Sequence, residues 1–131
     1  MTISILDTNV LLRFLVRDNT AQYNQAQQWF KEAEDGRRKI MIVPLVVAEA
    51  CYVLGSFYGQ SRDRIADMLE IFVSQRWMQV EERDVLLGVW QYYRKGLHFV
   101  DSYLRSWTAI HGGTILSFDK ALNRAGKAAL E

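Results

Sequence analysis

The chain has few of the residues that mark disulfide-rich, zinc-binding or proline-rich proteins. Its 131 residues include one cysteine (Cys51), one proline (Pro44) and two histidines. A single cysteine excludes an internal disulfide and a metal site built from several thiolates. With no basic and apolar leader segment in view, a reducing cytoplasm is the expected location.

An excess of charge of one sign is also lacking. The chain carries 16 Lys and Arg against 15 Asp and Glu, a formal net charge of +1. No overall field therefore attracts nucleic acid or an anionic membrane, and any electrostatic function depends on local arrangement. Half of the residues are hydrophobic, which at this length is enough for a core. We expect a single domain spanning residues 1–131.

The longest apolar stretch is too interrupted for a membrane span. Residues 40–59 read IMIVPLVVAEACYVLGSFYG and are almost long and apolar enough to cross a bilayer. Pro44 and Glu49 argue against this reading. A short β-branched run followed by Pro at a first helical position is typical of a buried strand and helix, so no membrane association is expected.

Apolar spacing predicts strands that alternate with helices. We expect strands at residues 2–6, 40–43, 77–80 and 114–117, the first of them buried. This alternation predicts an α/β fold with a mainly parallel sheet, and the final seven residues are too few to decide on a fifth strand. The expected helices run from Thr8 or Asn9, through Ala26–Ala33, from Pro44, after Ser61, through Val85–Tyr93, around Asp101 and after Asp119.

Four carboxylates are expected to converge at one end of this sheet. Asp7 directly follows the first strand, and Asp119 comes two residues after Ser117, the end of the fourth. Glu49 lies in the helix that leaves the second strand, and Asp101 lies in the first turn of the helix before the fourth. In an open parallel sheet, ligands bind beside the carboxyl ends of the strands. The order of these residues therefore predicts one acidic cluster.

Such a cluster needs protons or a cation. Two carboxylates about 4 Å apart repel by roughly 4 kcal/mol at a surface-like dielectric. An all-oxygen cluster without cysteine suits a hard ion such as Mg²⁺ or Mn²⁺. The waters of such an ion are candidate nucleophiles, and the ion also neutralises phosphate oxygens. The cluster therefore predicts phosphodiester hydrolysis.

Each acid also has a structural interpretation. Asp7 and Asp119 stand where they could cap the following helices. Asp101 stands in a first helical turn, four residues before Arg105, where it could stabilise the helix end and form an i, i+4 pair. Glu49 differs, because its flanks LVVA and ACYV are apolar and offer no charged partner at helical spacing. For the other three acids, capping and function both remain open.

Four motifs in order, which lie between residues 5 and 122, carry a resemblance over nearly the whole chain: ILDTNVLLRFL, VPLVVAEACYVL, HFVDSYLRSWTAIHGG and TILSFDKAL. In these motifs it resembles the PIN-domain ribonucleases, particularly the VapC-like toxins of type II toxin–antitoxin pairs. The resemblance implies a three-layer α/β/α fold with a central parallel sheet of four to five strands. It also implies RNA cleavage by acids that bind Mg²⁺ or Mn²⁺. Carried over by motif, the catalytic and metal-site acids are Asp7, Glu49, Asp101 and Asp119, with Asn9 and Ser117 as supporting polar residues.

The last third of the chain is rich in basic residues. From Arg94 to Leu130, six Lys or Arg accompany two acids, Asp101 and Asp119. With a metal neutralising these two acids, the region would present a positive surface to an RNA backbone, although a solvated helical face explains the same charges. The expected substrate contacts are Arg13, Arg105 and Lys120.

The resemblance also implies partners. Toxins of this type are held by a small antitoxin, so we expect a cognate antitoxin that inserts a segment near the acids. We also expect a homodimer, with DNA contacted only through the antitoxin complex.

Two other functions remain open. An aspartyl-phosphate phosphatase of the haloacid-dehalogenase type would use Asp7 as a nucleophile after the first strand. That class wants a second Asp two residues later, where this chain has Asn9. A catalytically idle PIN-like RNA-binding or accessory module would keep the fold without cleavage, which the four intact acids oppose.

Overall fold

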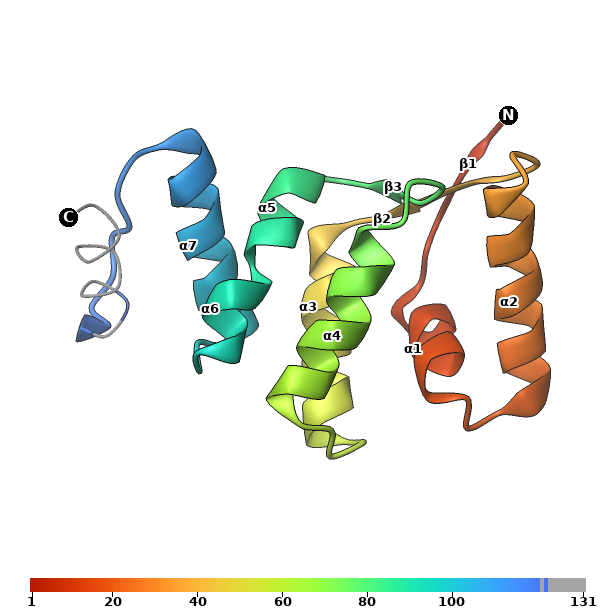
Figure 1. The fold of residues 1–131 in the computed structure, drawn as a ribbon, viewed down its shortest axis with the longest axis horizontal. Helices are drawn as coiled ribbons and strands as arrows, with labels where there is room; N and C mark the ends of the chain where they lie inside the picture. The colour runs from red at the N-terminus through yellow and green to blue at the C-terminus, as the bar shows by residue number, and fades with distance from the viewer. Residues whose placement is uncertain (121, 123–131) are drawn as a thin grey trace.

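The computed structural model describes residues 1–120 and 122. The predicted α/β class with a parallel sheet is confirmed (Figure 1). In chain order, the elements are β1 (Ile3–Ile5), α1 (Thr8–Val16), α2 (Thr20–Glu34), β2 (Lys39–Ile42), α3 (Pro44–Ser56), α4 (Arg62–Val73), β3 (Gln79–Val80), α5 (Arg83–Gly88), α6 (Trp90–Arg94) and α7 (Phe99–His111).

The strands of the described residues form one parallel sheet in the order β1-β2-β3. Ile5 is paired with Met41, and the ladder continues for one more bond from the Leu6 N–H to the Met41 carbonyl oxygen (2.8 Å). β2 is the central strand, and its side chains Ile40 and Ile42 are buried. This pairing fixes the point at which β1 ends and the chain turns into α1.

Local sequence explains where several helices begin. The Asn19 side chain accepts a hydrogen bond from the Gln22 N–H (3.0 Å), and Ser61 accepts one from the Arg64 N–H (3.2 Å). These bonds satisfy N–H groups that lack a partner within the helix. Pro44 is the first residue of α3, where its missing N–H removes no helical bond.

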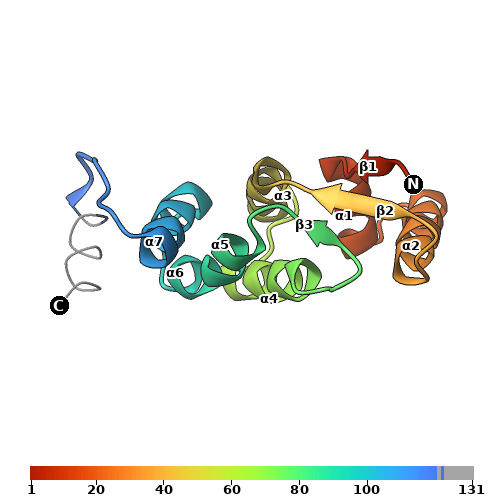
Figure 2. The ribbon, with the colours of Figure 1, turned by 90° about the horizontal axis from the view of Figure 1, so that it is seen from above.

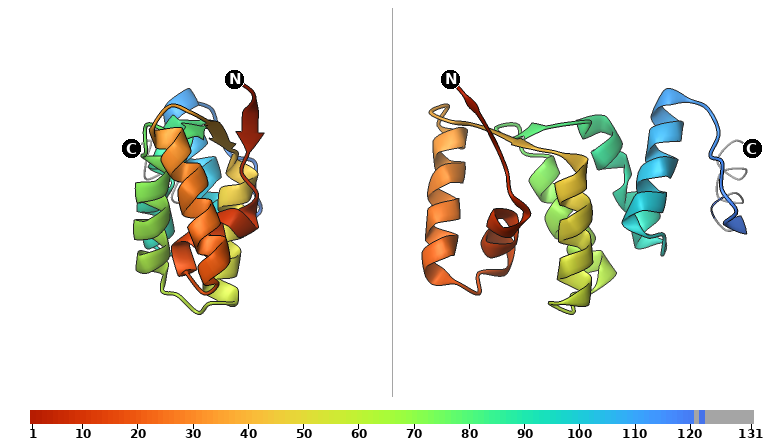
Figure 3. Two further views of the ribbon diagram at one scale, coloured as in Figure 1. Left: turned by 90° about the vertical axis from the view of Figure 1, so that its right-hand side faces the viewer. Right: turned by 180° about the vertical axis from the view of Figure 1, so that it is seen from behind.

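The helices lie in a row, with the strands over one end of it. α1, α2 and β1 lie together at one end of the molecule and α7 lies toward the other (Figures 1 and 3). α3 lies between them and packs against both α1 and α7. One hydrophobic core cluster joins the helices, and its fully buried members include Leu11, Ile42, Leu54, Leu69, Leu86 and Trp90.

The predicted strand at residues 114–117 is wrong. These residues form no strand in the described chain, and three views place them on the side of α7 that faces away from the sheet (Figures 1 to 3). Gly112 and Gly113 turn the chain out of α7 with φ values of 84° and 99°, a conformation that favours glycine. Leu116 and Phe118 are fully exposed, at 98% and 107%. The described sheet therefore has three strands instead of the expected four to five.

Burial of β1 was also predicted wrongly. Ile3 and Ile5 are 44% and 60% exposed, and β1 is an edge strand of the described sheet. The stretch 40–59 forms β2 and α3 as predicted, and no helix in residues 1–120 and 122 is long and apolar enough to cross a membrane.

Two further expectations concern the second half of the chain. The helix predicted through Val85–Tyr93 is divided into α5 and α6, which meet at Val89. The undecided fifth strand, in the last seven residues, lies outside the described residues, as does most of the helix expected after Asp119.

Candidate active site

Asp7 lies at the junction of β1 and α1, as predicted. Its carbonyl oxygen accepts the first helical hydrogen bonds, from the N–H groups of Val10 (3.1 Å) and Leu11 (3.4 Å). Its carboxylate, in contrast, forms no capping bond with α1. The side chain is exposed and makes no hydrogen bond or ion pair with any other described residue. This observation removes the capping interpretation of Asp7 and leaves the carboxylate available to a ligand.

A groove of about 270 Å³ opens beside Asp7. One wall comes from the start of α1, where Asn9 and Arg13 lie four residues apart and therefore on one helical face. The other wall comes from α2, where residues 22, 25 and 29 share a face by the same spacing. The groove is lined by Asp7, Asn9, Val10, Arg13, Gln22, Gln25 and Trp29.

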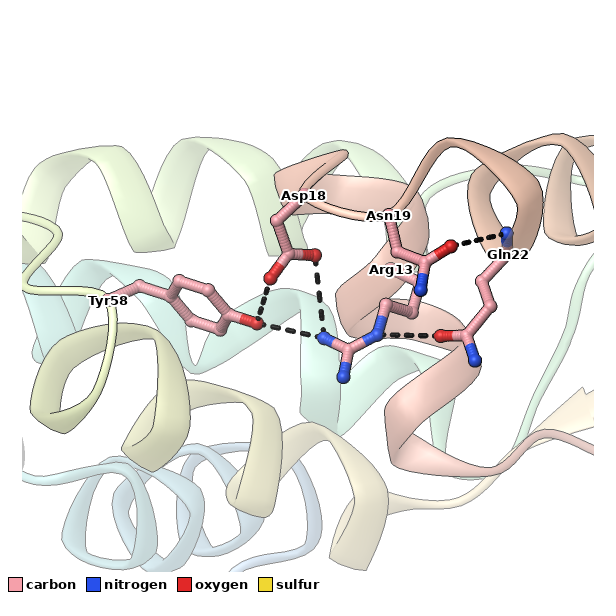
Figure 4. A network of polar contacts seen from close by, with 5 residues as sticks. All are labelled: Arg13, Asp18, Asn19, Gln22 and Tyr58. Atoms are coloured by element: carbon pink, nitrogen blue, oxygen red, sulfur yellow. Dashed lines mark hydrogen bonds and ion pairs between the residues drawn. The ribbon is translucent and has the colours of Figure 1, made fainter.

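Arg13 lines this groove and is held by a network of polar contacts (Figure 4). Its Nε donates to the Gln22 Oε1 (2.8 Å), and its Nη1 donates to the Tyr58 hydroxyl (2.9 Å) and to Asp18 (3.4 Å). The Tyr58 hydroxyl in turn donates to the second Asp18 oxygen (2.9 Å). Burial raises the pKa of Tyr58, and its hydrogen bond to Asp18 raises that pKa further. Nη2 has no partner among the described residues, so two N–H groups of Arg13 remain available to an anion (Figure 4).

The carboxylates of Glu49 and Asp101 also form no polar contact with another described residue. Glu49 was expected among apolar neighbours, but it is exposed, because α3 buries the face that carries Val47, Ala50 and Leu54 instead. Asp101 is half-buried in the first turn of α7 and does not form the i, i+4 ion pair with Arg105. Neither acid has a hydrogen bond or ion pair within residues 1–120 and 122.

Asp119 and Ser117 form a local turn. The Leu122 N–H donates to the Asp119 carboxylate (3.2 Å), and the Asp119 N–H donates to the Ser117 hydroxyl (2.9 Å). The first of these bonds is the capping arrangement that the sequence left open for Asp119. The turn lies beyond α7, at the opposite end of the molecule from β1 and α1 (Figure 3).

The predicted acids suit a hard divalent ion by chemistry but not by placement. All four offer only oxygen ligands, which Mg²⁺ and Mn²⁺ prefer. However, no group of three or more His, Cys, Asp or Glu side chains in the described chain could hold a metal ion. The described arrangement therefore does not fit a cage of several protein acids. Mg²⁺ commonly uses one or two carboxylates together with substrate phosphates, so a divalent-ion requirement stays a prediction.

The expected basic contacts have different surroundings. Arg105 is buried with its guanidinium carbon 5.4 Å from the centre of the Tyr92 ring, so it does not add to an exposed positive face. Arg94 is engaged by Asp67 and Glu70, each at 2.8 Å. Lys120 is exposed beside the Asp119 turn.

The sequence analysis missed the α2 wall of the groove. Gln22, Gln25 and Trp29 follow the helical period, but nothing local shows that this face of α2 meets the end of β1. The same holds for Tyr58, which contacts Arg13 across 45 positions of the sequence. The sequence carries only a partial signal for this wall. The polar residues at positions 22 and 25 do not interrupt an apolar stripe of the helix, so they do not stand out.

Comparison with known proteins gives a family. The sequence profile of the PIN domain family matches residues 4–128, nearly the whole chain. Searches of curated proteins and of solved structures found no match. PIN domains are typically nucleases and generally use divalent metals such as Mg²⁺. The chain belongs to the PIN domain family.

Proposed function

We propose that the protein is an endoribonuclease that hydrolyses RNA phosphodiester bonds at the groove beside Asp7. The observation that carries the proposal is the Asp7 carboxylate. It is exposed just after a strand, forms no capping hydrogen bond with α1 and lines a groove together with Arg13. The resemblance of ILDTNVLLRFL to the first PIN motif supports the assignment of this carboxylate as the first acid of a nuclease site.

The residues that line the groove suggest separate catalytic roles. A carboxylate such as Asp7 accepts a proton from a water that attacks phosphorus. Arg13, fixed by Gln22 and Asp18, offers its free Nη2 N–H groups to the phosphate oxygens, whose negative charge grows in the transition state. Because three bonds already hold its guanidinium, little reorganisation accompanies binding. The resemblance to PIN nucleases implies Glu49 and Asp101 as further acids, and neither of them lines this groove.

The proposed function is tested by incubating single-stranded and structured RNAs with the wild-type protein and with Asp7→Asn. We expect cleavage by the wild type in Mg²⁺ or Mn²⁺, no cleavage in EDTA and no cleavage by the variant. Asp63→Asn is the matched control, because Asp63 is an exposed acid in the first turn of another helix, α4. Equal cleavage by wild type and Asp7→Asn would identify a contaminant and end the proposal.

A catalytically idle RNA-binding module is the alternative function. It is favoured by the observation that the described acids do not form a cluster that could hold a metal ion. Binding of RNA without cleavage in any metal would support it. The match to the PIN family favours both of these functions over an aspartyl-phosphate phosphatase.

We further propose that the protein is the toxin of a toxin–antitoxin pair, forms a homodimer and contacts DNA only within the antitoxin complex. Large exposed apolar side chains support protein partners, among them Leu45 and Tyr52 on α3 and Val100 and Trp107 on α7. A small neighbouring open reading frame whose product co-purifies with this chain and suppresses cleavage is the expected result. Light scattering of the purified protein tests the dimer.

A further inference from the structure

The groove beside Asp7 has more chemistry than phosphate cleavage uses. Its α2 wall carries an indole ring and two primary amides, whereas a phosphate needs only positive charge and N–H donors. This wall runs along one face of α2 from Gln22, which is bonded to Arg13, to Trp29. The excess polar and aromatic groups indicate a second contact with the substrate.

Trp29 provides a flat apolar surface. It is half-buried and packs against the core on one side, while it lines the groove on the other. Its ring makes no contact with another aromatic ring in the described part of the chain, unlike Phe30 and Trp77, whose centroids are 5.6 Å apart. An indole that is anchored on one side and open on the other is a stacking platform for a base.

Gln25 and Asn9 provide free amides. Neither side chain has a hydrogen-bond partner among residues 1–120 and 122, and both line the groove. Gln22 differs, because its Oε1 already accepts from Arg13 (2.8 Å). A primary amide presents a donor and an acceptor side by side, which is the pattern that pairs with the edge of a nucleobase.

We propose that this groove holds one unpaired nucleobase of the RNA, stacked on Trp29 and hydrogen-bonded by Gln25, with the adjoining phosphate between Asp7 and Arg13. The proposal rests on the proposed function and adds the substrate class, an unpaired nucleotide at the cut. A base paired in a helix has its edge occupied and its faces stacked, so it cannot enter.

A nucleobase fits the groove better than a peptide segment does. The volume of about 270 Å³ is small, and its lining comes from two helices and the residue before the first of them. The groove also carries a cation, Arg13, and an aromatic surface, Trp29, which suit the phosphate and the base of a nucleotide. A protein segment in the same groove is the alternative outcome of the test.

The test is a binding cycle with short fluorescein-labelled single-stranded RNAs in EDTA, followed by fluorescence anisotropy. One abasic residue is moved along the RNA, and each RNA is measured with the wild type, Trp29→Ala and Trp29→Phe. We expect one position at which loss of the base weakens binding to the wild type by about 5- to 150-fold, the range for stacking of one base. In Trp29→Ala the same loss has no effect, and Trp29→Phe restores it.

Gln25→Ala gives a second measurement with a matched control. Gln27 lies on the same helix, is exposed and does not line the groove, so Gln27→Ala leaves binding unchanged. Gln25→Ala is expected to weaken binding roughly 2- to 12-fold, the value of one net hydrogen bond. Thermal melts of the variants verify that each one is folded.

The outcomes separate the inference from the proposed function. RNA that neither binds nor is cleaved by the wild type ends the proposed function. If RNA binds or is cleaved but no base position is coupled to Trp29, only the proposal of the nucleobase site is overturned. Trp29→Ala that leaves RNA binding unchanged but loses a protein partner assigns the groove to that partner, and also overturns the site.

Discussion

Asp7 and Asp119 follow similar apolar tetrads, ISIL and TILS, yet their surroundings differ completely. Asp7 ends a strand paired to β2, beside a groove and a fixed guanidinium. Asp119 lies in a turn beyond α7, next to the fully exposed Leu116 and Phe118. The difference shows that a carboxylate after an apolar run becomes part of a site only where that run finds a strand to pair with.

The largest contrast is expected between the reactivity of a thiol in the packed helix α3 and that of a thiol in the exposed segment after α7. Cys51 is buried in α3, and burial raises the pKa of its thiol from 9.0 to about 12. Since only the thiolate reacts, alkylation of Cys51 near pH 8 is expected to be about a thousandfold slower than that of an ordinary thiol. A cysteine placed at the exposed position by Leu116→Cys is the matched ordinary thiol.

This contrast also has a pH dependence. The unfolded thiol ionises near 9.0 while the folded thiol stays protonated to about 12, so folding stability falls as pH rises through this interval. Labelling by iodoacetamide, followed by mass spectrometry, measures both rates. Equal rates at the two positions would show that the packing of α3 opens as readily as the segment after α7.

Packing free energy gives the next contrast. Leu11 is fully buried in α1, so Leu11→Ala is expected to lower the free energy of unfolding by about 2–5 kcal/mol. Leu116→Ala removes the same atoms from a side chain that is 98% exposed and is expected to change stability by less than about 0.5 kcal/mol. Urea unfolding followed by circular dichroism compares the two. A large loss for Leu116→Ala would mean that residues 114–118 are covered in solution.

The smallest effect is expected from Tyr58. Tyr58→Phe removes the hydroxyl that bridges Arg13 and Asp18, while the ring contact with Phe57 remains. We expect a stability loss of about 1 kcal/mol, the value of a net hydrogen bond, and weaker RNA binding because Arg13 is less well held. Asp18→Asn keeps an acceptor for the hydroxyl and serves as the comparison. No change in either quantity would show that the ion pair alone positions Arg13.

Local sequence predicted most elements because their signals are local. Pro44 and Ser61 mark helix starts by their own chemistry, and α3 and α4 begin at these positions. Asp7 was located correctly for the same reason, since a strand that passes directly into a helix fixes the residue between them.

The errors arise where distant segments decide. Ile5 and Leu116 are both apolar residues in strand-like runs, but whether either is buried depends on what lies against it, which the local pattern does not contain. The groove was missed on the same ground, because Gln25 and Trp29 gain meaning only when α2 lies beside Asp7. The resemblance supplied the acids, but their distances depend on the packing of α1, α3 and α7.

The most direct test of the account compares RNA cleavage by Asp7→Asn and Asp119→Asn. Asparagine caps a helix as well as aspartate does, so Asp119→Asn keeps its turn and both variants stay folded. We predict that Asp7→Asn loses about 10²- to 10⁴-fold in cleavage rate, the range for a positioned general base, while Asp119→Asn keeps the rate of the wild type. Equal losses in both variants would contradict the account, because they would require Asp119 to lie in the groove beside Asp7.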